Sequence, residues 1–323
     1  MKFYLAPMEG LTGYVYRNAY HALFPAMDKY FTPFISPSQK RGMRTREKKD
    51  VAPENNLGMY TVPQLMANRL EPFLEVVRIL HGLGYQEINL NLGCPSPTVV
   101  TKGKGAGFLD EPRLLDRFFN EVFKHMEGEP ALRDIRLSVK SRLGISFSDE
   151  FPDILKVFNA HPLSEIILHP RVQEDFYNNK PDLCAFAYAL VNSEHPICYN
   201  GNLFSKNDYQ KFIKEFPDTP AVMLGRGILA NPALLMDIQN KQGLTLYMLK
   251  EYHNLLYKGY QGEMNGERDV LFKMKELWFY IGALFPDADK EFKKIKKSNH
   301  YMEYEAAVNS IFSQYEICTD ITF

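Results

Sequence analysis

The chain has 323 residues, of which 45% are hydrophobic and 24% are charged. This composition excludes a mostly disordered or collagen-like protein, and the length is typical of one large domain or two smaller ones. The formal net charge is −1 at pH 7, which excludes a surface coated in positive charge but allows a local cluster that binds nucleic acid.

The distribution of residue types excludes further classes of protein. No run of about 18 apolar residues occurs, so we expect no transmembrane helix. The N-terminal residues have no apolar stretch long enough for a signal peptide, so none is expected. The four cysteines are far apart and form no C-x-x-C pair, so we expect no disulfide scaffold and no metal site. These features predict a cytoplasmic protein, and no stable protein partner is expected.

Eight short apolar segments recur along the chain up to residue 225. Most of them lie about 24 to 32 residues apart, which is the length of one β-strand followed by one helix. We expect strands at 3–6, 30–35, 63–67, 87–92, 136–140, 165–169, 196–200 and 221–225.

Helical periodicity fills several of the intervals between these segments. It is clear at 71–83 and 114–123, and Ser205 is placed to cap a further helix. Eight β-α units in series predict an α/β fold with a parallel sheet, most economically closed into a (β/α)₈ TIM barrel. An open doubly wound sheet is the alternative.

The pattern becomes helical throughout after the last predicted strand. We therefore expect a catalytic barrel over residues 1–240 and a small C-terminal all-α domain over residues 241–323. The helices expected in this second domain are 244–260, 267–285, 287–297 and 303–312.

The residues that close the predicted strands are unusually polar and rich in glycine. The active site of such a barrel forms at the C-terminal ends of its strands, so these residues are the candidates for chemistry. In chain order they are Pro7, Met8, Glu9, Gln64, Asn91, Cys94, Lys140, Arg142, His169, Asn200, Gly201, Asn202, Gly225 and Arg226.

The last two strand ends are suited to a phosphate. Gly201 and Gly225 let backbone N–H groups come close to an anion, and Arg226 can add a bidentate contact. Gln64 can donate and accept hydrogen bonds at the edge of a heteroaromatic ring, and Lys140 can place positive charge beside that ring. FMN fits these demands, while pyridoxal phosphate, which also needs a lysine and a phosphate site, stays open as the alternative.

Cys94 is the only cysteine that follows a predicted strand directly, and it lies between Gly93 and Pro95. An unperturbed thiol, with a pKa near ~8.5, is mostly protonated at neutral pH and can act as a general acid. A nearby Lys140 or Arg142 would lower this pKa and favour a nucleophile instead. Both roles are open from the residues alone.

Three further segments carry glycine or positive charge. The glycine run at 102–107 matches neither a dinucleotide fingerprint nor a P-loop, and it predicts either a loop that covers the active site or a plain surface loop. Two basic clusters are predicted as solvated surface or as contacts for nucleic-acid phosphates. They consist of Lys40, Arg41, Arg44, Arg46, Lys48 and Lys49, and of Lys290, Lys293, Lys294, Lys296 and Lys297.

In these residues the chain resembles the tRNA-dihydrouridine synthases, which are flavoenzymes that reduce a uracil base in tRNA. The resemblance covers nearly the whole length. Its motifs occur in order on successive predicted strands, at 5–10, 64–65, 91–96, 140–144, 169–171, 200–201 and 225–227. One departure is Pro170, where the family usually has glycine, and this makes the role of Arg171 less certain.

The resemblance implies a role for each candidate residue. FMN is the implied cofactor, with Pro7, Met8 and Glu9 along its ring and Gln64 at the polar edge of the ring. The polar end of the ring or the bound base would contact Lys140 and His169, and the uracil would face Asn91 and Arg142. The phosphate would be held by Asn200, Gly201, Asn202, Gly225 and Arg226.

The resemblance also implies a reaction. NADPH or NADH would reduce the bound FMN, and a hydride would then pass to C6 of a uridine in tRNA. Cys94 would protonate C5, which gives 5,6-dihydrouridine. The all-α domain would bind tRNA.

Two other functions are consistent with parts of this pattern. An FMN-dependent barrel dehydrogenase that acts on a free pyrimidine or dihydropyrimidine would use the same cofactor residues and Cys94, but it would give the all-α domain and the lysine clusters no role. A catalytically inactive barrel that binds RNA would not need the polar residues at the strand ends.

Overall fold

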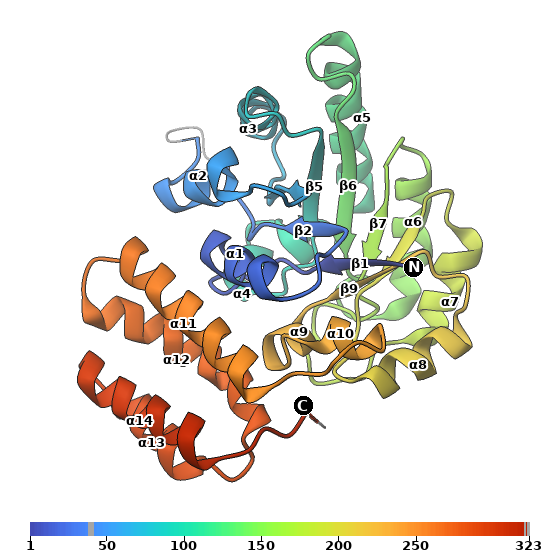
Figure 1. Ribbon diagram of the computed structural model, residues 1–323. Coiled ribbons are helices and arrows are strands. Elements are labelled where there is room, and N and C mark those ends of the chain that lie inside the picture. The colour runs from blue at the N-terminus through green and yellow to red at the C-terminus, as the bar shows by residue number, and fades with distance from the viewer. Residues whose placement is uncertain (38–41, 320, 322–323) are drawn as a thin grey trace. The chain divides into compact units, whose positions relative to one another are not determined.

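The computed structural model describes residues 1–37, 42–319 and 321. Its strands form one parallel sheet (Figure 1). They are β1 (Lys2–Leu5), β2 (Lys29–Phe31), β3 (Thr61–Val62), β4 (Gln64–Leu65), β5 (Glu87–Leu92), β6 (Arg136–Ser141), β7 (Ile166–Leu168), β8 (Ile197–Tyr199) and β9 (Ala221–Leu224).

The sheet closes on itself through the segment that contains β3 and β4. These two strands are the outermost members of the sheet order, yet only Pro63 separates them in the chain. Pro63 has no N–H group for the ladder, but its carbonyl accepts a hydrogen bond from the backbone of Asn89 at 2.9 Å. Because β3 pairs with β2 and β4 pairs with β5, the two are halves of one strand of a barrel. The predicted (β/α)₈ barrel with eight strands is confirmed, and an open sheet is excluded.

Helices alternate with the strands, as the spacing predicted. They are α1 (Tyr14–Leu23), α2 (Thr45–Val51), α3 (Leu70–Gly82), α4 (Pro97–Val100), α5 (Pro112–Gly128), α6 (Phe151–Asn159), α7 (Leu183–Asn192), α8 (Lys206–Glu215), α9 (Arg226–Ala230) and α10 (Leu234–Ile238).

The sequence features that start and bury these helices are visible in the structure. Helix α5 begins with Pro112, and its buried side chains recur every three or four residues. The predicted cap of α8 is confirmed, because the Ser205 hydroxyl accepts the backbone N–H of Asp208 at 3.1 Å.

Four helices follow the barrel units: α11 (Leu246–Glu263), α12 (Glu267–Ile281), α13 (Asp289–Lys297) and α14 (Tyr301–Gln314). Their core contains a buried polar chain in which the Trp278 indole donates to the Tyr304 hydroxyl at 2.8 Å. The same hydroxyl is hydrogen-bonded to Nε2 of His253 at 2.6 Å. Burial lowers the pKa of His253 to about 4, so the ring is neutral at pH 7.

The chain divides into two compact units. The first unit, which we call the strand unit, comprises residues 1–7, 28–201 and 216–223. The second, the helical unit, comprises residues 8–27, 202–215 and 224–323, so that α1, α8, α9 and α10 group with the four C-terminal helices. The division into domains at residue 240 stays a prediction. In the part of the chain that the structure describes, no helix is both long and apolar enough to cross a membrane.

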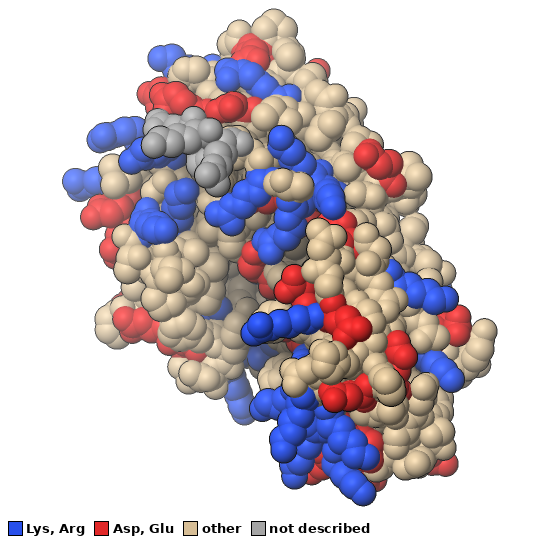
Figure 2. All heavy atoms as spheres, turned by 90° about the vertical axis from the view of Figure 1, so that its left-hand side faces the viewer, with Lys and Arg blue, Asp and Glu red and all other residues tan. Residues whose placement is uncertain are grey.

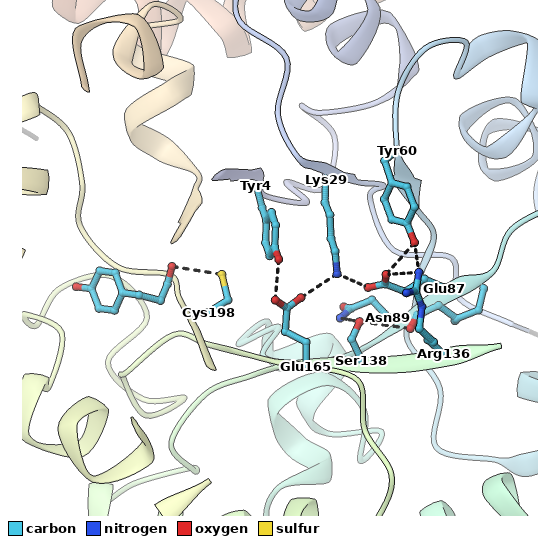
Figure 3. Close-up of polar contacts among 11 residues, drawn as sticks. Tyr4, Lys29, Tyr60, Glu87, Asn89, Arg136, Ser138, Glu165 and Cys198 are labelled. Atoms are coloured by element: carbon cyan, nitrogen blue, oxygen red, sulfur yellow. Dashed lines mark hydrogen bonds and ion pairs between the residues drawn. The ribbon is translucent and has the colours of Figure 1, made fainter. Parts of the chain in front are cut away.

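The N-terminal ends of the strands hold a closed network of charges (Figure 3). Lys29 lies 2.7 Å from Glu87 and 3.0 Å from Glu165. The Tyr4 hydroxyl donates to Glu165 at 2.7 Å, and the Tyr60 hydroxyl donates to Glu87 at 3.1 Å. Burial lowers the pKa of Lys29, but the two carboxylates outweigh this effect and the pKa is raised. Because these charges satisfy one another, we assign this end of the barrel a structural role.

Candidate active site

A chain of buried polar side chains crosses β4, β5 and β6 and reaches Asn91 near the C-terminal end of β5. The Gln64 amide donates to the Asn89 side chain at 2.7 Å and accepts from the Asn91 side chain at 2.8 Å. The Asn89 amide in turn donates to the Ser138 hydroxyl at 2.9 Å. Asn89 and Asn91 point to the same side of β5 because side chains alternate along a strand. This chain fixes the orientation of Gln64, which is completely buried.

The turn that carries Cys94 is held by Asn91, the last residue in this series of hydrogen-bonded side chains. The side-chain oxygen of Asn91 accepts the backbone N–H groups of Gly93 and Cys94, at 3.1 and 2.9 Å. The Cys94 side chain is half-buried. Asn91 therefore fixes the backbone from which the thiol projects.

The glycine run packs directly against this turn. The backbone N–H of Ala106 donates to the Cys94 carbonyl at 3.1 Å. Gly105 has a φ of +56°, and a Cβ atom there would lie 2.8 Å from the Cys94 carbonyl oxygen and 2.9 Å from the Cys94 Cβ atom. Glycine is needed because of both its conformation and this close approach. Of the two expectations for this run, the structure favours a segment that belongs to the Cys94 site.

Positive charge accumulates on the same segment. Burial lowers the pKa of Lys104, and the neighbouring charges of Lys102 and Arg69 lower it further. Lys102 and Arg69 are exposed. The side chain of Asn68 holds the segment by donating to the carbonyls of Lys102 and Gly103, at 2.9 and 3.0 Å.

Lys140 brings a titratable cation to the end of β6. Burial lowers the pKa of Lys140 to about 8, and the nearby Arg142 charge contributes to the shift. Interactions with the sulfur atoms of Cys198 and, to a smaller extent, Cys94 raise the pKa and oppose this shift. The predicted site residues Cys94 and Lys140 therefore lie close enough to influence one another's charge.

Arg142 is a buried clamp between two loops. Its guanidinium donates to the carbonyl oxygens of Gly93 at 3.0 Å, Val172 at 2.8 Å and Phe176 at 2.8 Å. These bonds use three of the five N–H donors. The structure therefore shows Arg142 joining the Cys94 turn to the loop after β7, and its predicted contact with uracil stays a prediction.

His169 follows β7 and contacts Arg171. The Arg171 guanidinium lies 2.8 Å from Nε2 of His169 and also donates to the Asn179 carbonyl at 2.6 Å. Because a guanidinium only donates, Nε2 of His169 accepts and the ring proton lies on Nδ1. Arg171, whose role the sequence left uncertain because of Pro170, is completely buried and sets the tautomer of His169.

The predicted phosphate residues are divided between the two units. In the strand unit, the Asn200 amide donates to the Met223 carbonyl at 2.9 Å, and a Cβ atom at Gly201 would overlap the Tyr199 hydroxyl. In the helical unit, Arg226 donates to the Asn202 side chain at 2.9 Å. The structure brings Asn202 and Arg226 together, and a shared phosphate stays a prediction.

The remaining sequence predictions concern residues 7–9, the two basic clusters and the metal site. Met8 and Glu9 belong to the helical unit, whereas Pro7 is the last residue of the first segment of the strand unit. Lys40 and Arg41 lie outside the described residues, while the other members of their cluster lie on or beside α2 and are exposed. The five lysines of the second cluster are exposed on α13. Within residues 1–37, 42–319 and 321, no group of three or more His, Cys, Asp or Glu residues could hold a metal ion.

Several residues that hold the candidate site residues in place were not predicted from the sequence. Asn89, Ser138 and Gln173 are buried and polar, and Gln173 donates to the Pro95 carbonyl at 2.9 Å. For Asn89 a signal existed, since it lies two residues before Asn91 and thus on the same face of the strand. No local pattern pointed to Gln173, because its contact depends on how two distant loops fold.

Comparison with known proteins identifies the family to which these residues belong. Residues 4–307 match the family model of the dihydrouridine synthases (Dus). The chain belongs to this family. It is 28% identical over 313 residues to the tRNA-dihydrouridine(16) synthase of Pseudomonas putida, covering 93% of this chain and 94% of that protein. It is 26% identical over 287 residues to the probable tRNA-dihydrouridine synthase of Staphylococcus aureus, covering 85% and 81% of the two proteins.

Solved structures with similar folds are more distant in sequence. The old yellow enzyme homologue from Zymomonas mobilis superimposes with a TM-score of 0.53 at 10% identity, covering 82% of this chain and 96% of that one. Histamine dehydrogenase from Rhizobium sp. 4-9 gives a TM-score of 0.55 at 12% identity, covering 81% of this chain and 48% of that one. At these identities the likeness concerns the fold alone.

Proposed function

We propose that this member of the dihydrouridine synthase family is a cytoplasmic, FMN-dependent enzyme that reduces a specific uridine of tRNA to 5,6-dihydrouridine, with NADPH or NADH as the reductant. The observation that carries the proposal is the Cys94 turn, fixed by Asn91 and close to Lys140, in a chain that matches the family over residues 4–307. Relatives named as tRNA-dihydrouridine synthases support tRNA as the substrate.

The residues at the strand ends fit the chemistry of a flavin. Gln64 presents a fixed amide, Lys140 supplies a cation, and His169 has a proton on Nδ1 to donate. At Gly201 the absence of a side chain is explained by Tyr199, whose ring a Cβ atom would overlap. Membership in the family favours FMN over pyridoxal phosphate, which the sequence alone left open. We assign the ring to Pro7, Met8, Glu9, Gln64, Lys140 and His169, and the phosphate to Asn200, Gly201, Asn202, Gly225 and Arg226.

The chain's own residues would hold and deliver one proton. When bound, FMN supplies the hydride that is added to C6 of the uracil. The Sγ atom of Cys94 holds the proton that is delivered to C5, and Asn91 keeps the backbone at Cys94 in place for this transfer. Arg142 joins the same turn to the loop after β7, and we assign its two remaining N–H donors to the base.

The substrate has to present its base outside the stack, which costs a few kcal/mol. Contacts to the RNA backbone contribute binding energy that offsets this cost. Lys102 and Lys104, on the segment beside Cys94, and Arg69, which precedes α3 and lies near Lys104, are assigned to phosphates close to the reacting base. We assign further tRNA contacts to the helices of residues 241–323.

The proposal is tested on tRNA from cells with and without this gene. Purified protein should show a flavin spectrum, and digested tRNA from the deletion strain should lack dihydrouridine at one position. Position 16 is the first to examine, because several relatives carry that number in their names. A flavin spectrum with unchanged tRNA but turnover of free uracil or dihydroorotate would instead identify a dehydrogenase of free pyrimidines. Colourless protein that still binds tRNA would identify an inactive RNA-binding barrel.

A further inference from the structure

The turn that carries Cys94 is hydrogen-bonded at every one of its backbone polar groups. Its two N–H groups, at residues 93 and 94, donate to the side-chain oxygen of Asn91, and the third residue of the turn is a proline, which has no N–H group. In chain order, the three carbonyl oxygens of residues 93–95 accept from the Arg142 side chain at 3.0 Å, the Ala106 backbone at 3.1 Å and the Gln173 side chain at 2.9 Å. Segments that are far apart in the chain therefore meet at these three residues.

Gln173 is the member of this set to which the proposed reaction has given no role. It belongs to the loop after β7, and it is only 8% exposed. Asn91 and Arg142 are also assigned to the uracil, and Ala106 makes its contact through the backbone. The contact of the Gln173 side chain with the Cys94 turn therefore needs an explanation of its own.

The backbone around Gln173 is itself held in place. The backbone N–H groups of Gln173 and Glu174 donate to the carbonyls of residues 144 and 145, at 2.9 and 3.1 Å. In turn, the Glu150 carboxylate accepts the backbone N–H groups of residues 145–147, at 2.7, 2.8 and 2.7 Å. The Gln173 amide thus extends from a fixed backbone, so its position can determine the position of the turn.

Folding stability alone does not explain this contact. Pro95 is half-buried, so water can reach this part of the turn and could bond to the Pro95 carbonyl in place of Gln173. A protein hydrogen bond that water can replace contributes little net free energy to folding. Water would not hold the carbonyl at one point, however, because it moves with the turn. We therefore expect the contact to act mainly on the position of Cys94, which directly precedes Pro95.

We infer that Gln173 is a positioning residue for the proton transfer: by holding the Pro95 carbonyl, it fixes the direction in which the Cys94 thiol projects toward C5 of the uracil. A displacement of about 1 Å can cost about 100-fold in rate, so a single hydrogen bond to the turn is able to affect the reaction. The inference rests on the proposed function, since it takes Cys94 as the acid that protonates C5. It adds a residue that acts through the turn and needs no contact with the flavin or the base.

Binding of tRNA should not depend on Gln173. Its side chain carries no charge and is buried, whereas lysine and arginine side chains gather in groups on the face of the protein that Figure 2 shows. The phosphates of a nucleic acid bind to such charged groups. A variant of Gln173 should therefore change the rate at saturating tRNA and leave the KM for tRNA unchanged.

The test compares the full-length, flavin-loaded wild type with Gln173→Met, which has a side chain of similar length but no donor. Dihydrouridine formation at saturating tRNA should be about tenfold slower in the variant, because the turn keeps its other hydrogen bonds but loses this one. Reduction of the flavin by NADPH should keep the wild-type rate. The slowing caused by D₂O should be larger in the variant than in the wild type, because a thiol proton exchanges with solvent and its transfer becomes rate-limiting.

A double-mutant cycle separates positioning of the thiol from a general effect on the protein. If Gln173 acts through Cys94, Gln173→Met should cause no further slowing in a protein that already carries Cys94→Ala. Gln173→Asn, whose donor lies one carbon atom short of the carbonyl, should be slow like Gln173→Met, and it replaces that variant if the methionine prevents folding. Gln86→Met is the control and should behave like the wild type, because Gln86 is exposed and precedes β5.

A second measurement does not depend on turnover. In the oxidised, tRNA-free protein, the half-buried Cys94 thiol should react severalfold faster with iodoacetamide in Gln173→Met than in the wild type, since a turn with one hydrogen bond fewer exposes it more often. Mass spectrometry of the peptide that contains Cys94 distinguishes this reaction from that of the exposed Cys184 and Cys318.

The outcomes that overturn the inference are distinct from those that overturn the proposed function. If the wild type forms dihydrouridine and Gln173→Met forms it at the same rate, Gln173 does not position the acid. If Gln173→Met slows the reaction by the same factor with and without the Cys94 thiol, Gln173 acts elsewhere and the inference is wrong. Equal alkylation rates of Cys94 in the two proteins would also overturn it. If the wild type forms no dihydrouridine in tRNA, the proposed function fails and the inference fails with it.

Discussion

The side-chain oxygen of Asn91 accepts the backbone N–H of Cys94 at 2.9 Å. The same amide donates to Gln64 at 2.8 Å. One buried side chain thus connects the turn that carries the proposed proton donor to the residue assigned to the polar edge of the flavin. The geometry of both partners in the proposed reaction depends on this connection.

Replacing Asn91 by alanine should lower the rate of dihydrouridine formation about 100-fold at saturating tRNA. The two N–H groups of the turn lose their acceptor, and a thiol displaced by about 1 Å loses roughly that factor. Asn120→Ala is the matched control, because Asn120 is exposed on α5 and its amide donates to Asp116 of the same helix. A wild-type rate for Asn91→Ala would show that the turn holds Cys94 without this side chain.

Replacing Gly105 by alanine should damage the site from the other side of the Cys94 turn. The new Cβ atom would lie 2.8 Å from the Cys94 carbonyl oxygen, in a backbone conformation that alanine adopts poorly. We expect a loss of about 2 kcal/mol in the free energy of unfolding and a clear loss of activity. Gly82→Ala, which meets no atom within 4 Å, should change neither by a comparable amount. Equal behaviour of the two variants in denaturant unfolding and rate assays would contradict the close packing of this segment.

The reduction of the bound flavin by NADPH should depend on the charge of Lys140. Because burial lowers the pKa of Lys140 to about 8, the side chain is charged below this pH and becomes neutral above it. The rate of flavin bleaching without tRNA should therefore be constant below pH 8 and fall about tenfold per pH unit above it. Lys140→Arg keeps its charge and should show no such fall. A flat wild-type profile up to pH 10 would exclude Lys140 as the cation beside the flavin.

The helical unit should lose stability in mild acid because of His253. The folded protein holds this ring neutral with a pKa of about 4, whereas the unfolded chain protonates it below about pH 6.5. Between these values the unfolded state binds more protons, so the stabilising contribution is fully present above pH 6.5 and falls as the pH drops toward 4. At pH 5 the loss should be about 2 kcal/mol. His253→Gln, which cannot titrate, should show a smaller difference between pH 7 and pH 5 in denaturant unfolding followed by Trp278 fluorescence.

The fold and the strand-end residues could be predicted because they follow from local periodicity. Each predicted strand is present, and Gln64, Asn91 and Lys140 lie at strand ends as expected. The partners of Arg142 could not be predicted, since its contacts with Val172 and Phe176 depend on the paths of two separate loops.

The grouping of the helices was also not predictable from the sequence. Helix α1 lies early in the chain, yet its first residue, Tyr14, donates a hydrogen bond to Glu263 of α11 at 2.6 Å. Hydrophobic periodicity shows which face of a helix is buried but not which distant helix covers that face. The predicted boundary at residue 240 follows from a change in the sequence pattern. Such a change gives no information on contacts between segments that are far apart in sequence.

The most direct test of the account compares wild-type protein with Cys94→Ala on one unmodified tRNA transcript with NADPH. We predict that the wild type makes one uridine two hydrogen atoms heavier, as detected by mass spectrometry of digested tRNA. Cys94→Ala should do so about 100-fold or more slowly, because it lacks the general acid, while its flavin is reduced by NADPH at the wild-type rate. Cys184→Ala, at an exposed cysteine on α7, should behave like the wild type. Unchanged uridine with the wild type, or equal rates for the wild type and Cys94→Ala, would contradict the account.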